Sequence, residues 1–320
     1  MPPDADRRAT PEGRRPAWFV GVYPLLPQDE TRTAAYRRLT ERAREDPEFR
    51  GLEVPFTGPF DIDELTALLA DDGEIVLTTI PGVVAELTGD PGFGLASADP
   101  EGRERARRYI ALARDAVTDL NQAAGRAVVR GVTLHSAPAA ARSAADAFER
   151  SLTEIAGWDW GGAHLLVEHC DAAVPGRVAS KGFLGLDDEL DALDAVGHER
   201  LGVLINWGRS AIEGRSPLRA VEHLRQARER GLLRGLMFSG CSPHADARGG
   251  AWADFHLPPA SVDPLSLLDE RAARDAVAAA GDVTGLVVTG MKVGAPATAD
   301  LDARERILVE SASVLLGALR

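Results

Sequence analysis

Eight short apolar segments, each followed by a segment of helical character, constrain the fold of this 320-residue chain more than any other feature. Runs of this length read as buried strands because they are too short for buried helices. The predicted strands are 18–26, 51–56, 74–80, 128–134, 165–167, 201–205, 233–238 and 283–288. The predicted helices are 31–45, 61–70, 101–124, 140–156, 187–196, one that starts at Ser216-Pro217, 264–280 and 301–319. Such alternation is typical of parallel βαβ units, and eight units predict a single (β/α)8 TIM barrel over residues 16–320.

Two segments fall outside this alternation. Residues 1–15 hold Pro, Asp and Arg without the apolar stretch of a secretion signal, so we expect a flexible N-terminal tail. Residues 83–100 are rich in Gly, Pro and Asp, which predicts an irregular binding loop or lid. No apolar run approaches the ~20 residues that a bilayer-spanning helix needs, so we expect no membrane segment.

Charge and motif content narrow the class of protein. A formal net charge of −13 disfavours binding to nucleic acid or to an anionic membrane, since both need a basic face. No G-x-G-x-x-G follows a strand, so a dinucleotide-binding fold is not indicated. The two cysteines, Cys170 and Cys241, make no disulfide framework and are expected to be buried thiols rather than nucleophiles. Together these features predict a soluble cytoplasmic enzyme, with or without assembly into a homo-oligomer.

Polar side chains stand at the ends of most predicted strands. Strand ends on one rim of a (β/α)8 barrel surround a common cavity, so these residues form a candidate constellation. Its members are Glu53, His135, Glu168, His169, Asn206, Arg209, Ser239 and Lys292. Glu168 follows a buried apolar run, where a carboxylate must be paired or neutralised. An ion pair with an arginine and a catalytic role both satisfy that need. His169 points away from Glu168 if strand alternation persists, which indicates a structural role.

Three of these residues, Glu168, Glu53 and Lys292, are predicted to be catalytic. Glu53 lies among apolar neighbours, and a structural carboxylate tied to arginine is its alternative reading. Lys181 and Lys292 are the only lysines in a chain whose other cations are arginines, which is a hint that Lys292 is wanted for its compact ammonium. The alternative is that both lysines are ordinary surface residues without a special role.

Other polar and aromatic residues suit a sugar ligand. Arg209 and Arg215 could bind a carboxylate, phosphate or sulfonate through paired hydrogen bonds. Trp207 and Trp252 could stack on a sugar ring, although plain packing is the alternative for both. The remaining predicted substrate contacts are His135, Asn206, Ser239, Asp254 and His256.

The sequence is compatible both with a bound divalent metal ion and with its absence. His244, Asp254 and His256 have the chemistry of metal ligands, but their spacing matches no fixed metal motif. A divalent ion, if bound, would be held by Glu168 together with His135, His244, Asp254 or His256. His135 could equally be a satisfied core histidine. The histidines at strand starts or on helices, His164, His198 and His223, are predicted to be structural.

Four motifs carry a family resemblance. They are Gly-Leu-Glu-Val-Pro-Phe at 51–56, Val-Glu-His-Cys-Asp at 167–171, Asn-Trp-Gly-Arg at 206–209 and Asp-Phe-His-Leu-Pro at 254–258. The chain resembles the xylose isomerase-like TIM-barrel superfamily of sugar isomerases and epimerases, and within it an uncharacterised bacterial family. The resemblance implies a divalent cation held by a Glu, an Asp, a His and a second Glu. Glu168 matches the first ligand, whereas Asn206, Ser239 and the neighbourhood of Thr289 occupy the other three places.

These observations predict an enzyme that isomerises or epimerises a sugar or sugar acid by proton transfer next to a carbonyl. Glu168 would be the general base or acid and Glu53 its partner, with burial raising a carboxyl pKa towards neutrality. Lys292, Arg209 or His135 would stabilise the charge of the enediolate. Two alternatives remain open. One is a glycoside hydrolase or lyase that uses Glu53 and Glu168. The other is a sugar-binding barrel that has lost its metal site.

Overall fold

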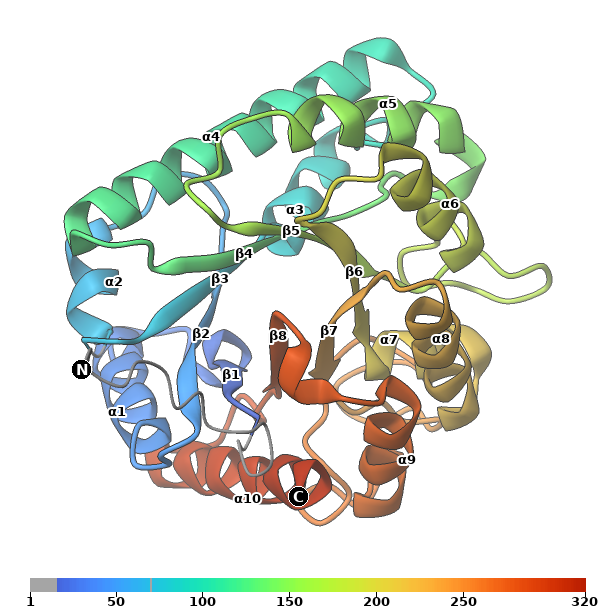
Figure 1. Ribbon diagram of the computed structural model, residues 1–320. Coiled ribbons are helices and arrows are strands. Elements are labelled where there is room, and N and C mark those ends of the chain that lie inside the picture. Colours follow the sequence, from blue (N-terminus) through green and yellow to red (C-terminus); the bar gives the residue numbers. More distant parts are fainter. Residues whose placement is uncertain (1–15, 70) are drawn as a thin grey trace, which may run out of the picture.

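Eight parallel strands close into a barrel in which each strand pairs with the next and β8 pairs with β1 (Figure 1). The computed structural model describes residues 16–69 and 71–320. The strands are β1 Trp18–Gly21, β2 Phe49–Pro55, β3 Glu74–Thr78, β4 Val129–Leu134, β5 His164–His169, β6 Leu201–Asn206, β7 Leu233–Phe238 and β8 Val288–Lys292. The predicted (β/α)8 barrel is confirmed. The tail expected at residues 1–15 lies outside the described residues.

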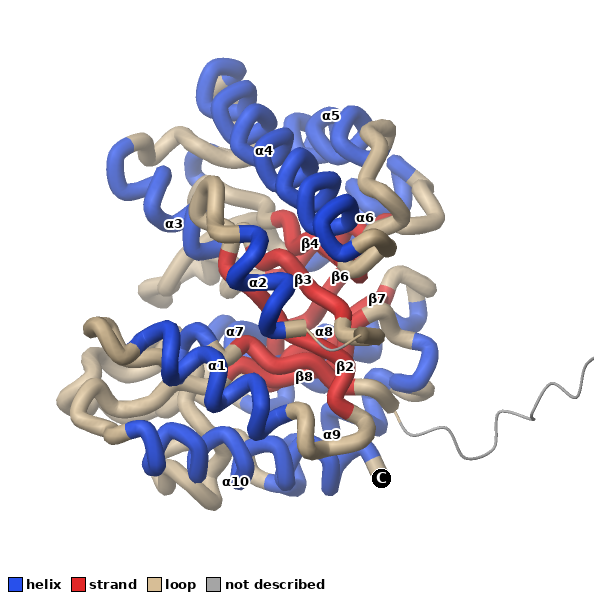
Figure 2. Tube along the Cα trace, turned by 90° about the vertical axis from the view of Figure 1, so that its left-hand side faces the viewer, coloured by secondary structure: helices blue, strands red, loops and turns tan. Residues whose placement is uncertain are grey.

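Helices surround the barrel as an outer ring (Figures 1 and 2). They are α1 Arg32–Ala43, α2 Ile62–Leu68, α3 Ile80–Gly89, α4 Pro100–Ala124, α5 Ala145–Ala156, α6 Leu186–Val196, α7 Trp207–Gly214, α8 Pro217–Glu229, α9 Glu270–Ala280 and α10 Leu301–Leu319. Local chemistry sets many of their starts. The Ser216 hydroxyl accepts a hydrogen bond from the N–H of Leu218 at the start of α8, as the Ser-Pro pair predicted. Within the described ranges, no helix has the length and apolar character needed to span a membrane.

The strand predicted at 18–26 ends at Gly21, and the helix predicted at 264–280 begins at Glu270. Two further boundaries differ from the prediction, and each has a local cause. The irregular segment expected at 83–100 begins as α3, because Pro81 fits the first helical turn and Val83 is buried against the barrel. The strand expected at 283–288 instead runs Val288–Lys292. Asp282 accepts a hydrogen bond from the N–H of Thr284 and closes a 3-10 turn at Val283–Gly285, which delays the strand. Lys292 therefore ends a strand rather than following one.

The barrel interior changes from apolar to polar along the strands. Its apolar layer is a separate buried cluster, and its members are Phe19, Val76, Leu166, Leu204, Met237, Val287 and Val288. Residues two positions further along a strand point to the same side. Leu166 is thus followed inward by Glu168, and Leu204 by Asn206, both fully buried. A polar layer therefore lies at the carboxyl ends of the strands, the side on which (β/α)8 enzymes build their sites.

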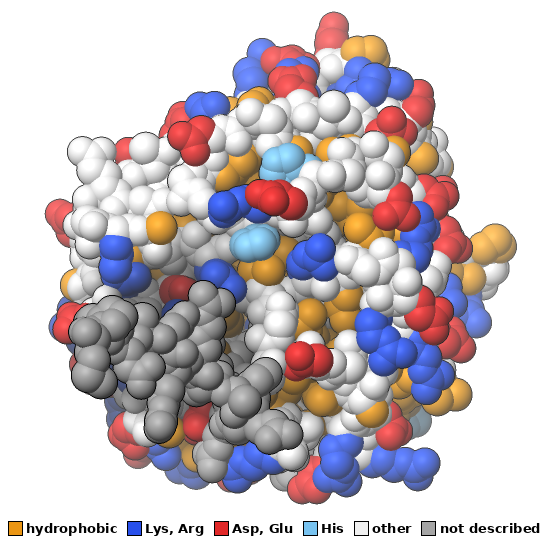
Figure 3. Space-filling model, viewed as in Figure 1, with side chains coloured by type: hydrophobic (Ala, Val, Ile, Leu, Met, Phe, Trp, Pro, Cys, Tyr) orange, Lys and Arg blue, Asp and Glu red, His pale blue; other side chains and the backbone are white. Residues whose placement is uncertain are grey.

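Figure 3 looks at the opposite end of the barrel, the face formed by the amino ends of the strands, where acidic and basic side chains are interspersed. Cys170 and Cys241 are both buried, and burial raises the pKa of each thiol to about 12. The expectation that both thiols are buried is confirmed.

The apolar layer generates a stability prediction. Leu204→Ala is expected to lower the free energy of unfolding by about 2–5 kcal/mol, because a fully buried side chain leaves a cavity. The matched control is Leu218→Ala, at a position that is 67% exposed, with an expected change within about 0.5 kcal/mol. Urea unfolding followed by circular dichroism measures both. Equal losses in the two variants would contradict the placement of Leu204 inside the barrel.

Candidate active site

The ammonium group of Lys292 lies between two buried carboxylates. Its Nζ donates to Oε1 of Glu53 at 2.9 Å and to Oε1 of Glu168 at 2.8 Å. All three side chains are fully buried, and they come from β8, β2 and β5. Closure of the barrel by the β8–β1 pair brings these strands together. The three residues predicted to be catalytic therefore form one cluster.

Glu168 is the most heavily paired member of this cluster. Besides Lys292, its Oε1 lies 2.7 Å from Nη1 of Arg209 and accepts a 3.2 Å hydrogen bond from Nδ2 of Asn206. Its Oε2 lies 3.2 Å from Nε2 of His135. Burial alone would raise the pKa of Glu168, but Arg209 and Lys292 outweigh it and hold the pKa well below its usual range. The rise in a carboxyl pKa that burial predicts is therefore reversed at Glu168, because the neighbouring cations favour the carboxylate.

Glu53 has the opposite character. Burial raises its pKa, and Lys292 opposes the rise only in part. Its Oε2 is buried and has no hydrogen-bond partner among the described residues. Gly21 makes room for that oxygen, since a Cβ there would come within 2.6 Å of it. Glu53, rather than Glu168, has both the free oxygen and the pKa direction that proton transfer at neutral pH requires.

Neutral side chains extend the polar layer around Glu168. Burial lowers the pKa of His135 to about 4, so its imidazole is neutral near pH 7. Its Nδ1 lies 3.2 Å from the hydroxyl of Thr79. Asn206 Oδ1 accepts a 2.8 Å hydrogen bond from Ser239. These groups can accept or donate hydrogen bonds to a polar ligand without changing the charge of the site.

The end of β6 explains why Arg209 reaches the cluster. Asn206 is the N-cap of α7, and its side-chain oxygen accepts from the N–H of Arg209. Gly208 lets α7 pack closely, because a Cβ there would lie 2.5 Å from the carbonyl oxygen of Ser239. The first turn of α7 therefore sits directly over the barrel end. Arg209 was predicted as a site residue, whereas this helix was not predicted.

A loop between β7 and α9 closes onto the cluster through Asp254. Asp254 Oδ2 accepts from Nε of Arg209 at 3.1 Å and from Nζ of Lys181 at 2.5 Å, and its Oδ1 lies 3.1 Å from Nδ1 of His256. His256 and Trp252 both adopt the left-handed backbone conformation, which is costly for residues other than glycine. Lys181 was not predicted as a site residue, although the scarcity of lysine had drawn attention to it.

Four predicted residues make other contacts or lie at the surface. Trp207 is fully buried in the hydrophobic core, which is the packing alternative. The guanidinium of Arg215 lies 5.3 Å from the ring centre of Trp252, so these two side chains contact each other. His244 is exposed.

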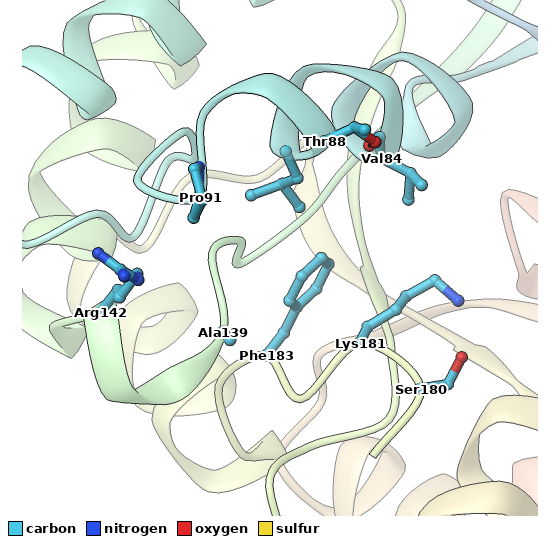
Figure 4. A pocket seen from close by; sticks show the side chains of 9 residues that line it. Val84, Thr88, Pro91, Ala139, Arg142, Ser180, Lys181 and Phe183 are labelled. Carbon is cyan, nitrogen blue, oxygen red and sulfur yellow. The ribbon is translucent and has the colours of Figure 1, made fainter. Parts of the chain in front are cut away.

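A surface pocket of 400 Å³ is lined by side chains of α3 and of the loop that follows β5 (Figure 4). Leu87 and Phe183 are apolar parts of its lining, and Arg142 and Lys181 add positive charge. Lys181 also binds Asp254, which in turn binds Arg209.

The residues at the barrel centre do not fit the divalent cation of the superfamily. Glu168, the one matching ligand, already has the ammonium of Lys292 and the guanidinium of Arg209 against the same oxygen. These fixed cations would repel a metal ion, and Asn206 and Ser239 add no negative charge. Of the partners predicted for Glu168, His135 contacts it, whereas Asp254 and His256 contact each other.

Residues 19–307 match the family described as "Domain of unknown function (DUF4862)". The chain belongs to this family. The "Uncharacterized protein STM3670" of Salmonella typhimurium (strain LT2) is 34% identical over 317 residues, which cover 95% of this chain and 98% of that protein. The uncharacterised family expected from the sequence motifs is confirmed.

Solved structures resemble this DUF4862 protein in fold. The 3-keto-D-glucoside 4-epimerase YcjR from E. coli superposes with a TM-score of 0.54 at 13% identity, covering 93% of this chain and 99% of that chain. A xylose isomerase domain protein from Alicyclobacillus acidocaldarius subsp. acidocaldarius gives a TM-score of 0.53 at 14% identity, covering 94% and 99%. The DUF4862 protein therefore has the xylose isomerase-like TIM-barrel fold.

The cluster generates a prediction about Lys292. Lys292→Met is expected to lower the free energy of unfolding by about 3–5 kcal/mol, because it leaves two buried carboxylates without their shared cation. Adding Glu53→Gln to this variant should recover part of the loss. Arg38→Met breaks exposed ion pairs with Asp302 and Glu305 and should cost less than about 1 kcal/mol. Urea unfolding compares the four proteins, and a Lys292→Met variant as stable as the wild type would refute the pairing.

Proposed function

We propose that this DUF4862 protein isomerises or epimerises a sugar or sugar acid by moving a proton next to a carbonyl group. One observation carries the proposal. Glu53 holds a buried carboxylate oxygen that has no partner within the described chain, beside an ammonium group at the carboxyl end of a (β/α)8 barrel. Similarity to a 3-keto-D-glucoside 4-epimerase supports a sugar substrate.

Glu53 acts as the general base. Its raised pKa favours proton uptake near neutral pH. It takes a proton from the carbon next to the carbonyl; the electron pair of that C–H bond forms a C=C bond, and the π pair of the carbonyl moves to its oxygen, giving an enediolate. In an isomerisation the hydroxyl proton passes to the former carbonyl oxygen, and the protonated Glu53 returns its proton to the former carbonyl carbon, which leaves the new carbonyl at the neighbouring position.

Lys292 and Arg209 oppose the negative charge of the enediolate. Burial would lower the pKa of Lys292, but Glu168 and Glu53 outweigh it and raise the pKa, so the amine stays protonated. A protonated amine stabilises charge and does not attack a carbonyl to form a Schiff base. Glu168 stays ionised and orients both cations, as its contacts with them support.

The surface pocket that includes Lys181 would suit a small polar ligand, and Lys181 is connected to Arg209 through Asp254. Arg142 and Lys181 would favour a sugar that carries a carboxylate or another anionic group. Phe183 and Leu87 offer an apolar surface to the face of a sugar ring.

Glycoside hydrolysis is the less favoured reaction. It needs two carboxyl groups separated by about 5–9.5 Å with the glycosidic bond between them. The ammonium of Lys292 occupies the place between Glu53 and Glu168.

Hydrogen exchange tests the reaction. The wild type is incubated in D₂O with ketoses, aldoses, keto-glucosides and sugar acids, and loss of the C–H signal next to the carbonyl is followed by proton NMR. Glu53→Gln should reduce exchange by about 10²–10⁴-fold, because the amide cannot accept the proton. Glu199→Gln alters a carboxylate that is 86% exposed and should exchange like the wild type. Cleavage of a glycoside without exchange, or binding with neither, would reject the proposal.

The pH dependence tests the role of Glu53. A base must be unprotonated, so kcat/KM should fall as pH drops through the raised pKa of Glu53. Lys292→Met removes the cation that opposes this rise, so the acidic limb should move to higher pH. Circular dichroism first establishes that the variant is folded. A limb that does not move would exclude Glu53 as its origin.

A further inference from the structure

We propose that His169, Glu213 and His223 bind a structural Zn²⁺ ion on the outer side of the barrel wall. His169 ends β5, Glu213 lies on α7 and His223 lies on α8. His169 follows Glu168 directly and therefore points away from the barrel interior. This site is separate from the Glu53–Lys292–Glu168 cluster and does not depend on the proposed reaction.

The ligand atoms converge. Nε2 of His169 lies 2.9 Å from Oε2 of Glu213, and Nε2 of His223 lies 3.4 Å from Oε1 of the same carboxylate. The ligand atoms of the three residues all lie within 4.8 Å of one another, and their side chains are at most 3% exposed. Two imidazole nitrogens and a carboxylate form a donor set that Zn²⁺ prefers, with bonds of about 2.0–2.2 Å.

The outer nitrogens of both histidines are already oriented. Nδ1 of His169 lies 2.7 Å from Oε2 of Glu189, and Nδ1 of His223 lies 2.9 Å from the hydroxyl of Ser210. If both Nδ1 atoms donate, the lone pairs on both Nε2 atoms face Glu213. Metal-bound histidines are held in this way by a carboxylate or another acceptor on the far nitrogen. Nε2 of His223 is buried and, in the part of the chain described, has no hydrogen-bond partner.

The two buried carboxylates at this site carry more negative charge than the single cation of Arg219 can balance. Glu189 and Glu213 are buried carboxylates, and Arg219 binds Oε1 of Glu213 at 3.0 Å from a position that is 41% exposed. The backbone N–H of Ala172 donates to the other oxygen of Glu213 at 3.0 Å. Without a metal, both ring nitrogens of His169 lie within hydrogen-bonding distance of a carboxylate oxygen, which favours a hydrogen on each nitrogen. Zn²⁺ would take the place of the hydrogen on Nε2, so binding should release a proton.

The two buried clusters share structural elements. On β5, Glu168 faces the barrel interior and His169 faces the proposed metal. On α7, Arg209 and Glu213 are four residues apart, close to one helical turn. A metal bound outside would therefore fix the strand and the helix whose side chains meet inside the barrel at 2.7 Å.

Metal titration of the untagged protein tests the site. The protein is stripped with a chelator and titrated with Zn²⁺ by calorimetry in two buffers, and with Co²⁺ by absorption spectroscopy. We expect one equivalent of Zn²⁺, release of protons, a tetrahedral Co²⁺ spectrum and a higher Tm. His223→Ala should lose the high-affinity equivalent, whereas His244→Ala alters an exposed histidine outside the cluster and should retain it.

Two further variants keep the result decisive. If His223→Ala does not fold, Ser210→Ala should still fold and bind Zn²⁺ about 10–100-fold more weakly, because His223 loses its orienting partner. Glu53→Gln should bind Zn²⁺ like the wild type even if its hydrogen exchange is lost. Absence of stoichiometric binding by the wild type, unchanged affinity in Ser210→Ala, or loss of binding in Glu53→Gln would each overturn the proposal.

Discussion

The contact of the Lys292 ammonium with two buried carboxylates is the interaction on which the rest of the barrel interior depends. Glu53 and Glu168 are fully buried, and an ionised carboxylate is stable there only with a cation beside it. That cation comes from the last strand of the barrel and the carboxylates from the second and fifth. The charges of the polar layer are therefore neutralised only when the barrel closes, because closure brings Lys292 on β8 to Glu53 on β2 and Glu168 on β5.

The two buried carboxylates differ in the number of groups that contact them. Oε1 of Glu168 contacts Lys292, Arg209 and Asn206, and the two cations keep Glu168 ionised. Glu53 shares only Lys292 and keeps its second oxygen free of partners in the described chain. The same two residue types thus differ in chemistry because of the number of cations around them. The side-chain cations of Lys292 and Arg209 lie beside Glu168, the residue at which the family resemblance implies a divalent metal ion.

The wall of the barrel carries charge on both sides. Glu168 and Arg209 meet inside it, while His169 and Glu213 meet outside it, on the same strand and helix. Buried ion pairs on successive residues of β5 leave that strand little freedom to rotate or slip, because a shift of one residue would exchange the two clusters. Precise placement of the inner groups therefore follows from the outer contacts as well as from the inner ones.

The sequence by itself determined the architecture and the place of the buried polar cluster. Apolar runs alternating with helical segments fixed a (β/α)8 barrel, and polar residues at strand ends located Glu53, Glu168, Asn206 and Lys292 at one rim. Only the tertiary structure decided their chemistry, because a pKa depends on which charges lie within a few ångströms, and those charges come from distant strands. The sequence also could not bring His169, Glu213 and His223 together, since no local spacing records how α7 and α8 pack against β5.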